Sequence, residues 1–204
     1  MAEAAPKRAN YADLEAVQPH LVAEIIDGTL MTHPRPAPRH SLTAVALTHR
    51  LSGPFQFDGG GPGGWVFLSE PELHLGSDVL VPDLAAWRIA RLPVVPDTAW
   101  IEVSPDWVCE ILSASTERRD RTLKMRVYGE AGVRHMWLID PRLQLLEAFE
   151  LREGRWTKVG DWNSDDEVRA APFDAISFSL AGFWPLDKPL GFNEDRQSLY
   201  AGDR

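Results

Sequence analysis

The sequence lacks the features that several classes of protein require. Its 204 residues include a single cysteine, Cys109, which excludes an intrachain disulfide and a zinc-finger cluster, because both need paired thiols. No stretch approaches the roughly 18 consecutive apolar residues of a membrane helix, and residues 1–30 carry acids and no signal-peptide core. We therefore expect a cytoplasmic protein.

Positive charge is also scarce. The chain has 21 Lys and Arg residues against 30 Asp and Glu residues, a net charge of −9 at pH 7. A protein that coats nucleic acid does so through a broad surface of Lys and Arg. The densest basic cluster, between Arg118 and Arg126, is interleaved with acids, and a solvated helix face is the simpler interpretation for most of its arginines. Any contact with nucleic acid is therefore expected to be local, metal-bridged or made by an oligomer.

Histidines with metal-ligand spacing are missing as well. We find no such spacing, and no Ser/His/Asp arrangement, among His20, His33, His49, His74 and His135.

The composition that remains is that of a globular protein. Hydrophobic residues make up 44% of the chain and charged residues 25%, and no linker divides the chain into halves. We predict a single domain over residues 1–204, with an ordered core of about residues 20–188 and loose ends.

Local patterns predict a hairpin, a helix and two strands in the first half. The turn dipeptide Asp27-Gly28 favours a hairpin, and apolar residues at helical spacing before Gly53-Pro54 predict a helix that stops there. The predicted elements are a short helix over 11–17, the hairpin over 22–31, a helix over 40–51 and strands over 65–75 and 79–87.

The centre of the chain predicts a crossover unit. Two apolar runs, 107–112 and 134–140, are typical of interior strands. Between them the spacing predicts a helix over 117–131, with Thr116 as its N-cap and Gly132 as its C-terminal cap. Strand, helix and strand in this order predict a parallel pair. A hairpin over 144–160 and an apolar tail that packs back on the core complete an α/β (mixed α+β) fold, a central mixed sheet flanked by helices.

The central helix carries two charges on its apolar side. With about 100° of rotation per residue and Leu123 as the origin, Asp120 falls at about 60° and Lys124 at about 100°, in the stripe that contains Val127. Burying such groups is costly unless they are paired or functional. One interpretation is an Asp120–Lys124 pair that satisfies itself, with the lysine stem lying on apolar surface.

Two acids on apolar strands favour a functional interpretation. Glu110 lies in a run of Trp, Val, Cys, Ile and Leu, and Asp83 is flanked by apolar residues, where carboxylates are rarely buried without partners. Carboxylates suit Mg²⁺ or Mn²⁺, and such an ion can bridge to a phosphate. A lysine beside it would orient a water molecule or stabilise negative charge.

At these residues the sequence resembles the Uma-type family of predicted endonucleases, within the PD-(D/E)XK restriction-endonuclease-like superfamily. The resemblance spans about residues 20–185. It rests on the order of the following segments: Glu24–Gly28, Pro82-Asp83, Glu110–Ser113, Ser115-Thr116, Arg119-Asp120, Lys124, Tyr128, Ala131–Val133 and Trp137–Asp140.

The resemblance implies a restriction-endonuclease-like core with an extra N-terminal hairpin and a C-terminal β-hairpin. It also implies a catalytic set in which Asp83 and Glu110 bind Mg²⁺ (or Mn²⁺) and Lys124 is the catalytic lysine. The commoner pattern of the superfamily places that lysine two residues after the second acid, where this chain has Leu112. The helical angle of Lys124 agrees with a lysine that has moved to the helix.

Two further residues match the family but have equally simple structural explanations. Glu24 resembles the family's N-terminal acid and is a candidate metal ligand, although an edge-strand glutamate beside Asp27 would look the same. His40 stands where the family often has histidine, and a residue that packs or caps the helix is the simpler interpretation. Cys109 points away from Glu110 along the strand, so we expect a buried, inert thiol.

The leading functional expectation is a metal-dependent endonuclease that hydrolyses DNA as a homodimer. The acidic net charge leaves open a non-catalytic module that keeps the nuclease fold for binding or assembly. The same site chemistry would also serve a hydrolase of another phosphodiester.

Overall fold

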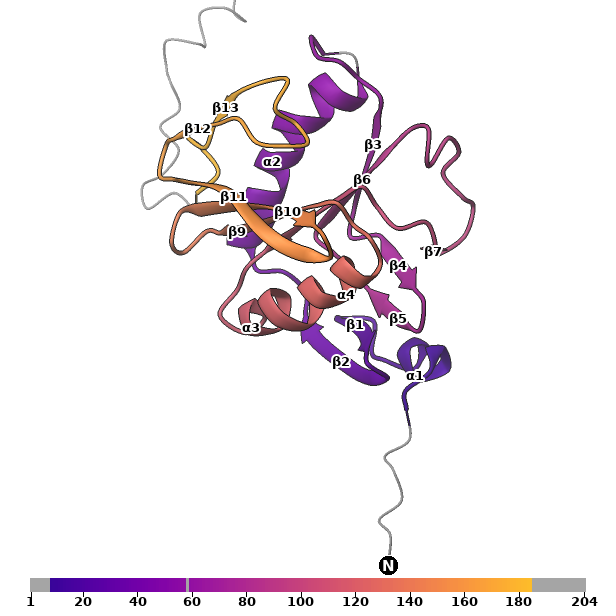
Figure 1. Cartoon of the computed structure of the whole chain (residues 1–204). Helices are drawn as coiled ribbons and strands as arrows, with labels where there is room; N and C mark the ends of the chain where they lie inside the picture. Colours follow the sequence, from indigo (N-terminus) through magenta and orange to yellow (C-terminus); the bar gives the residue numbers. More distant parts are fainter. Residues whose placement is uncertain (1–7, 58, 185–204) are drawn as a thin grey trace, which may run out of the picture.

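The computed structural model describes residues 8–57 and 59–184, and its strands form two main sheets (Figure 1). Residues 1–7 and 189–204 of the predicted loose ends lie outside the described residues, as do residues 185–188 of the predicted core. A short helix, α1 (Tyr11–Glu15), precedes the first strand, close to its predicted position. None of the helices in the described ranges has the length and apolar character needed to cross a membrane.

The larger sheet is mixed, as predicted. Its strand order is β11-β10-β9-β8-β6-β3, and only β8 and β9 run parallel. This parallel pair is the predicted crossover unit. The strands are β3 (Trp65–Ser69), β6 (Leu84–Arg88), β8 (Trp107–Ile111), β9 (His135–Asp140), β10 (Leu145–Arg152) and β11 (Arg155–Asn163).

The smaller sheet contains the predicted N-terminal hairpin. Its order is β2-β1-β5-β4-β7, with β1 (Leu21–Ile26), β2 (Thr29–Pro34), β4 (Glu72–Leu75), β5 (Asp78–Leu80) and β7 (Trp100–Ile101). The turn between β1 and β2 has φ 55° at Asp27 and 72° at Gly28. Positive φ at both central residues is what a tight two-residue hairpin requires.

The two faces of the larger sheet are covered by different elements (Figure 1). Helix α2 (Pro38–Gln56) and the apolar tail, which contains β12 (Glu167–Val168) and β13 (Phe178–Ser179), pack on one face. The segment from α3 (Glu117–Arg119) to α4 (Met125–Glu130) and the smaller sheet pack on the other. Because side chains alternate along a strand, Cys109 joins the first core and Glu110 points to the second face.

Helix α2 is longer than predicted, and its predicted end at Gly53-Pro54 is wrong. The helix continues to Gln56 with Pro54 inside it. Leu47, Leu51 and Phe55 follow one another at a spacing of four residues and are almost fully buried. Their burial against the sheet offsets the missing donor of the proline, since packing contributes more to helix stability than local propensity.

Both predicted strands of the 65–87 region are wrong in their extent, because each is two strands in different sheets. The first breaks at Glu70, where φ is 47°, between β3 and β4. The second breaks at residues 81–83, between β5 and β6. Continuous alternation of apolar residues does not reveal a change of sheet. The second break sets Asp83 at the junction of the two sheets.

The predicted central helix is present but not regular. It consists of α3 (Glu117–Arg119), a π-helical turn, η1 (Asp120–Lys124), and α4 (Met125–Glu130). Gly132 ends it with φ 76°, as predicted, but the side chain of Thr116 makes no capping hydrogen bond. A π-helical turn is uncommon and often marks a functional position, and this one begins and ends at the two buried charges.

Candidate active site

Asp83 is held between two elements at the junction of the sheets. Its Oδ2 accepts a hydrogen bond from the backbone N–H of Ile111 at 2.6 Å, and its Oδ1 lies 3.0 Å from Nε2 of His40. The His40 side chain, from the first turn of α2, is 14% exposed. Burial lowers the pKa of His40, but the hydrogen bond and charge of Asp83 outweigh it and raise the pKa overall.

Glu110 is buried between β8 and the helical segment, with 3% of the residue exposed. Its Oε1 accepts hydrogen bonds from the Tyr128 hydroxyl at 2.6 Å and from Nζ of Lys124 at 2.7 Å. Burial raises the pKa of Glu110 well above its usual value. Lys124 opposes this shift, and the neighbouring acids Asp120, Asp83 and Glu24 add to it.

Lys124 is almost fully buried and uses all its donors. Its Nζ contacts Oε1 of Glu110, Oε1 of Glu24 at 2.9 Å and the carbonyl oxygen of Val81 at 3.2 Å. An ammonium has three N–H donors, so each has one partner. Burial lowers the pKa of Lys124, but the carboxylates of Glu110 and Glu24 outweigh it and raise the pKa, which keeps the lysine charged.

Glu24 is not an edge-strand residue, so that interpretation is wrong. Strand β1 lies between β2 and β5, and Glu24 is fully buried. Its Oε1 also accepts a hydrogen bond from the N–H of Val81 at 3.0 Å. Burial raises the pKa of Glu24, but Lys124 and Arg119 together lower it below its usual value. Glu24 thus anchors the lysine to the N-terminal hairpin.

Asp120 is buried nearby, but it is not the ionic partner of Lys124. Its Oδ1 lies 3.7 Å from Nε of Arg119, whereas Lys124 pairs with Glu24 and Glu110. The interpretation that Asp120 and Lys124 pair with each other is therefore wrong, because the lysine contacts carboxylates on two strands, Glu24 and Glu110. Burial raises the pKa of Asp120 in spite of the opposing charge of Lys124.

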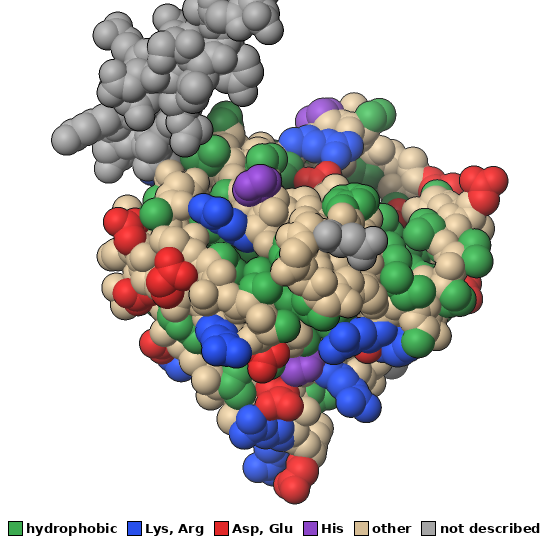
Figure 2. Space-filling model, turned by 90° about the horizontal axis from the view of Figure 1, so that it is seen from above, with side chains coloured by type: hydrophobic (Ala, Val, Ile, Leu, Met, Phe, Trp, Pro, Cys, Tyr) green, Lys and Arg blue, Asp and Glu red, His purple; other side chains and the backbone are tan. Residues whose placement is uncertain are grey.

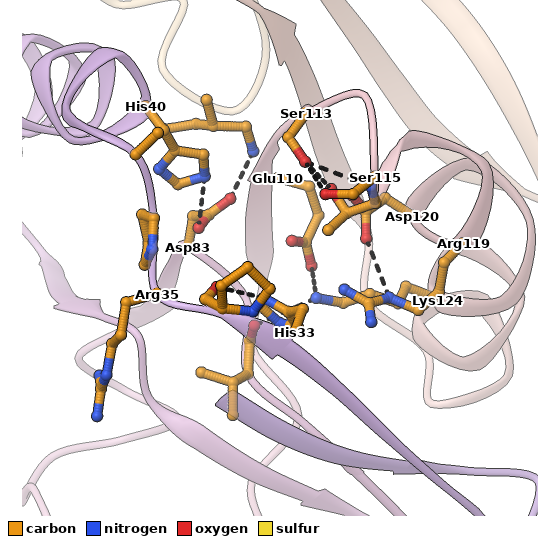
Figure 3. A pocket seen from close by; sticks show the side chains of 16 residues that line it. His33, Arg35, His40, Asp83, Glu110, Ser113, Ser115, Arg119, Asp120 and Lys124 are labelled. Atoms are coloured by element: carbon orange, nitrogen blue, oxygen red, sulfur yellow. Dashed lines mark hydrogen bonds and ion pairs between the residues drawn. The ribbon is translucent and has the colours of Figure 1, made fainter. Parts of the chain in front are cut away.

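These residues surround one pocket of about 160 Å³ (Figure 3). The predicted residues Asp83, Glu110, Lys124, Asp120 and His40 all line it. The structure therefore brings together side chains from α2, from the junction of the sheets, from β8 and from the π-helical turn. The volume accommodates several water molecules.

The sequence analysis assigned no role to three basic or histidine side chains that line the pocket: His33, Arg35 and Arg119. His33 lies 3.9 Å from Oε2 of Glu24, and Arg119 lies 3.5 Å from the same oxygen. The register of the hairpin indicates that His33 lies near Glu24. His33 is opposite Val22, and Val22 is two residues before Glu24. The side chains of His33 and Glu24 therefore lie on the same face of the sheet. Arg119 belonged to the basic cluster that we interpreted as a solvated face, yet its side chain is only 14% exposed.

Comparison with known proteins places the chain in a family. A family model described as "Uma2: Putative restriction endonuclease" matches residues 8–181. The chain belongs to the Uma2 family. This confirms the resemblance seen in the sequence, and Uma2 membership supports a nuclease that acts on nucleic acid.

A solved structure has the fold of this Uma2 protein. It is described as the crystal structure of a putative nuclease belonging to DUF820 from Anabaena variabilis ATCC 29413. The two chains are 19% identical, the match covers 84% of this chain and 94% of the other, and the TM-score is 0.69. The predicted mixed α+β fold, in which mixed sheets are flanked by helices, is therefore confirmed and is shared with this neighbour. No match was found among curated proteins.

The Uma2 pocket is lined by three acids, Asp83, Glu110 and Asp120, and by three basic side chains, Arg35, Arg119 and Lys124. Lys124 and Arg119 lie beside the buried acids, whereas Asp83 is paired with His40. A hard divalent cation prefers oxygen ligands such as these carboxylates.

The donor set fits Mg²⁺ by number and type. Within residues 8–57 and 59–184, no three acidic, histidine or cysteine side chains form a ready metal-binding group. Mg²⁺ commonly takes one or two carboxylates and fills its other positions with water and phosphate oxygens. Asp83 and Glu110 would meet this need: each oxygen of Asp83 has one partner and a second lone pair, and Glu110, whose Oε1 already accepts two hydrogen bonds, would offer its Oε2.

Proposed function

We propose that this protein is a Mg²⁺-dependent endonuclease that hydrolyses phosphodiester bonds of DNA. The observation that carries the proposal is the convergence of Asp83, Glu110 and Lys124 on one pocket, from three separate elements of the chain. Burying these charged groups together is costly for folding, which favours a role in chemistry. Uma2 membership supports a nucleic acid as the substrate.

Asp83 and Glu110 are the residues that would hold the metal ion, which when bound would supply Lewis-acid polarisation of the phosphoryl group. Their orientations are fixed by protein contacts. The N–H of Ile111 and the ring of His40 orient Asp83, and the hydroxyl of Tyr128 orients Glu110. Partners of this kind keep ligand oxygens in place before the ion arrives.

Lys124 is suited to stabilising negative charge. Its raised pKa means that it stays protonated, so it is a poor acceptor for the proton of the attacking water. A fixed ammonium in a site of low dielectric stabilises charge that develops on the phosphoryl oxygens. We assign Lys124 this role, and assign Glu24 the role of holding Lys124.

The distribution of surface charge agrees with a local contact to DNA. Figure 2 shows one face of the molecule, on which Lys and Arg side chains are mixed with Asp and Glu side chains in small groups, without a broad basic surface. Affinity would then come from a few contacts near the site. Cutting both strands of a duplex needs two active sites or two successive events, so we expect self-association.

The proposal is tested by incubating supercoiled plasmid with purified protein in Mg²⁺ or Mn²⁺. We expect nicked and linear DNA from the wild type and none in EDTA. Asp83→Asn and Lys124→Met should each lower the rate by at least about 100-fold. The matched control is Lys158→Met, because this lysine is 45% exposed and does not line the pocket; it should cut like the wild type.

Calorimetry separates an inactive binding module from an enzyme. The wild type should release or absorb heat on titration with Mn²⁺, and Asp83→Asn should lose this signal. A folded wild type that cuts no form of DNA or RNA in either metal would overturn the proposal.

A further inference from the structure

Arg119 is a charged side chain without close partners in the pocket. Among the described residues, its guanidinium makes two ionic contacts within 4 Å, Nη2 to Glu24 at 3.5 Å and Nε to Asp120 at 3.7 Å. Its Nε is buried without a hydrogen-bond partner among the described residues. Both contacts are longer than a hydrogen bond to a carboxylate, which is about 2.7–2.9 Å. The guanidinium therefore lies near these acids without being bound by them.

Other arginines of the same region show that close pairing is available to this fold. Arg142 donates to Asp140 at 2.6 Å and to Glu117 at 2.7 Å, and Arg126 donates to Glu130 at 2.9 Å. These arginines are about 40% exposed, whereas Arg119 is 14% exposed. The most buried guanidinium of the segment thus has the poorest hydrogen bonding, although burial makes a missing partner more costly.

The direction of the Arg119 side chain accounts for its poor hydrogen bonding. Arg119 lines the pocket, and Figure 3 shows it running from its helix toward the centre, next to Lys124. The two oxygens of Glu24 bring the two cations together, since Lys124 contacts Oε1 and Arg119 faces Oε2. The ammonium, which Glu24 binds, and the guanidinium, which faces the other oxygen of Glu24 at a longer distance, form a cationic pair beside the cavity.

We propose that Arg119 binds the non-bridging oxygens of a phosphate of the substrate, and that its missing hydrogen bonds are made by that phosphate. A guanidinium matches phosphate through two parallel N–H···O bonds. The hydroxyls of Ser113 and Thr116 line the same pocket and hydrogen-bond to each other at 3.0 Å, so the proposal rests on the guanidinium of Arg119. The inference rests on the proposed function, because it names the group by which the same site recognises a phosphodiester.

The alternative role for Arg119 is that of a counter-ion for Glu24 and Asp120. That role predicts a loss of stability in a variant but no change in the binding of DNA. The salt dependence of binding separates the two roles, because each phosphate contact contributes about 0.9 to the slope of log K against log salt concentration.

The experiment measures binding of a short fluorescein-labelled DNA duplex by fluorescence anisotropy over a range of NaCl concentrations, with Ca²⁺ as the divalent ion. Arg119→Met should weaken binding about tenfold and lower the salt slope by about one. Arg119→Lys keeps the charge but loses the paired N–H groups, so it should keep the slope and recover only part of the affinity. The matched control, Arg155→Met, removes an exposed charge from β11 and should change neither quantity.

Folding is checked in parallel by circular dichroism, and Arg119→Lys supplies the comparison if Arg119→Met is unstable. A wild-type slope and affinity in both folded Arg119 variants, or a wild type that binds no DNA, would overturn the inference. Cleavage by the wild type together with unchanged binding in the variants overturns the inference and leaves the nuclease proposal intact. If DNA binding depends on Arg119 but the wild type cleaves no DNA, the inference about phosphate binding stands and the nuclease proposal is overturned.

Discussion

Replacing Lys124 by methionine should destabilise the folded protein strongly, and the structure gives the scale of the effect. The ammonium lies 2.9 Å from Glu24 and 2.7 Å from Glu110. With an effective dielectric constant of about 20, each contact is worth about 6 kcal/mol of attraction. Desolvation of the three ions, at several kcal/mol each, offsets most of this. The cluster as a whole is therefore close to neutral for stability.

Removal of the lysine alone changes that balance, because both carboxylates stay buried without their cation. Protonating one of them limits the cost. A glutamate with an ordinary pKa of about 4.3 needs about 3.7 kcal/mol to take up a proton at pH 7. Buried pairs that lose one partner usually cost about 3–5 kcal/mol, and we expect Lys124→Met to lower the free energy of unfolding by this amount.

Urea denaturation followed by circular dichroism measures this quantity, with the slope m as a check on the two-state assumption. A double variant, Lys124→Met with Glu24→Gln, should recover part of the loss, with an interaction energy of about 0.5–3 kcal/mol. The exposed control Lys158→Met should behave like the wild type. If Lys124→Met cost no more than this control at unchanged m, the buried ion cluster would not exist in the folded protein.

Two further predictions concern other parts of the molecule. Burial raises the pKa of Asp140, but hydrogen bonds from Arg142 and from the N–H of Leu143 outweigh it and lower the pKa. A carboxylate of this kind stabilises the fold fully above its unfolded pKa of about 3.9, and its contribution is lost as the pH falls through the folded value. Asp140→Asn should therefore cost about 1–3 kcal/mol at pH 7 in urea denaturation, with a difference from the wild type that shrinks below about pH 4; a difference independent of pH would contradict this. Self-association should bury the exposed apolar side chains between β6 and β8, where Val94 is 75% exposed, because such patches commonly mark interfaces. Val94→Asp should lower the molar mass measured by light scattering, and a wild type that is monomeric at all concentrations would refute it.

The sequence predicted the central part of the fold because its signals there are local. The crossover unit from β8 to β9 depends on two apolar runs and a helical period, and each can be seen in a short window. Glu110 and Lys124 were found by the same logic, since a charge among apolar residues is conspicuous wherever the strand or helix finally lies. The prediction that Asp120 and Lys124 lie on the side of the helix that faces the sheet holds in spite of the π-helical turn, since both residues are buried.

What the sequence did not predict depends on contacts between distant segments. The changes of sheet near Glu70 and Asp83 are invisible in the alternation of apolar residues, because both sheets bury side chains with the same period. The interior position of Glu24 depends on β5 pairing with β1, which no local pattern encodes. Arg119 looked like its exposed neighbours because its burial comes from the hairpin residues Glu24 and His33, which are far away in the sequence.

The full use of the Lys124 donors has a consequence for how the protein would treat substrate and transition state. Every hydrogen bond that the ammonium gives to a phosphoryl oxygen must replace one to Glu24, Glu110 or Val81. In the ground state the exchange brings little net affinity, because the lysine leaves a partner of comparable strength. It becomes favourable only when the phosphoryl oxygens carry additional charge. In the proposed role, a lysine with no spare donor would lower the barrier of the reaction and would contribute little to tight binding of the substrate, which is the condition for an effect on kcat.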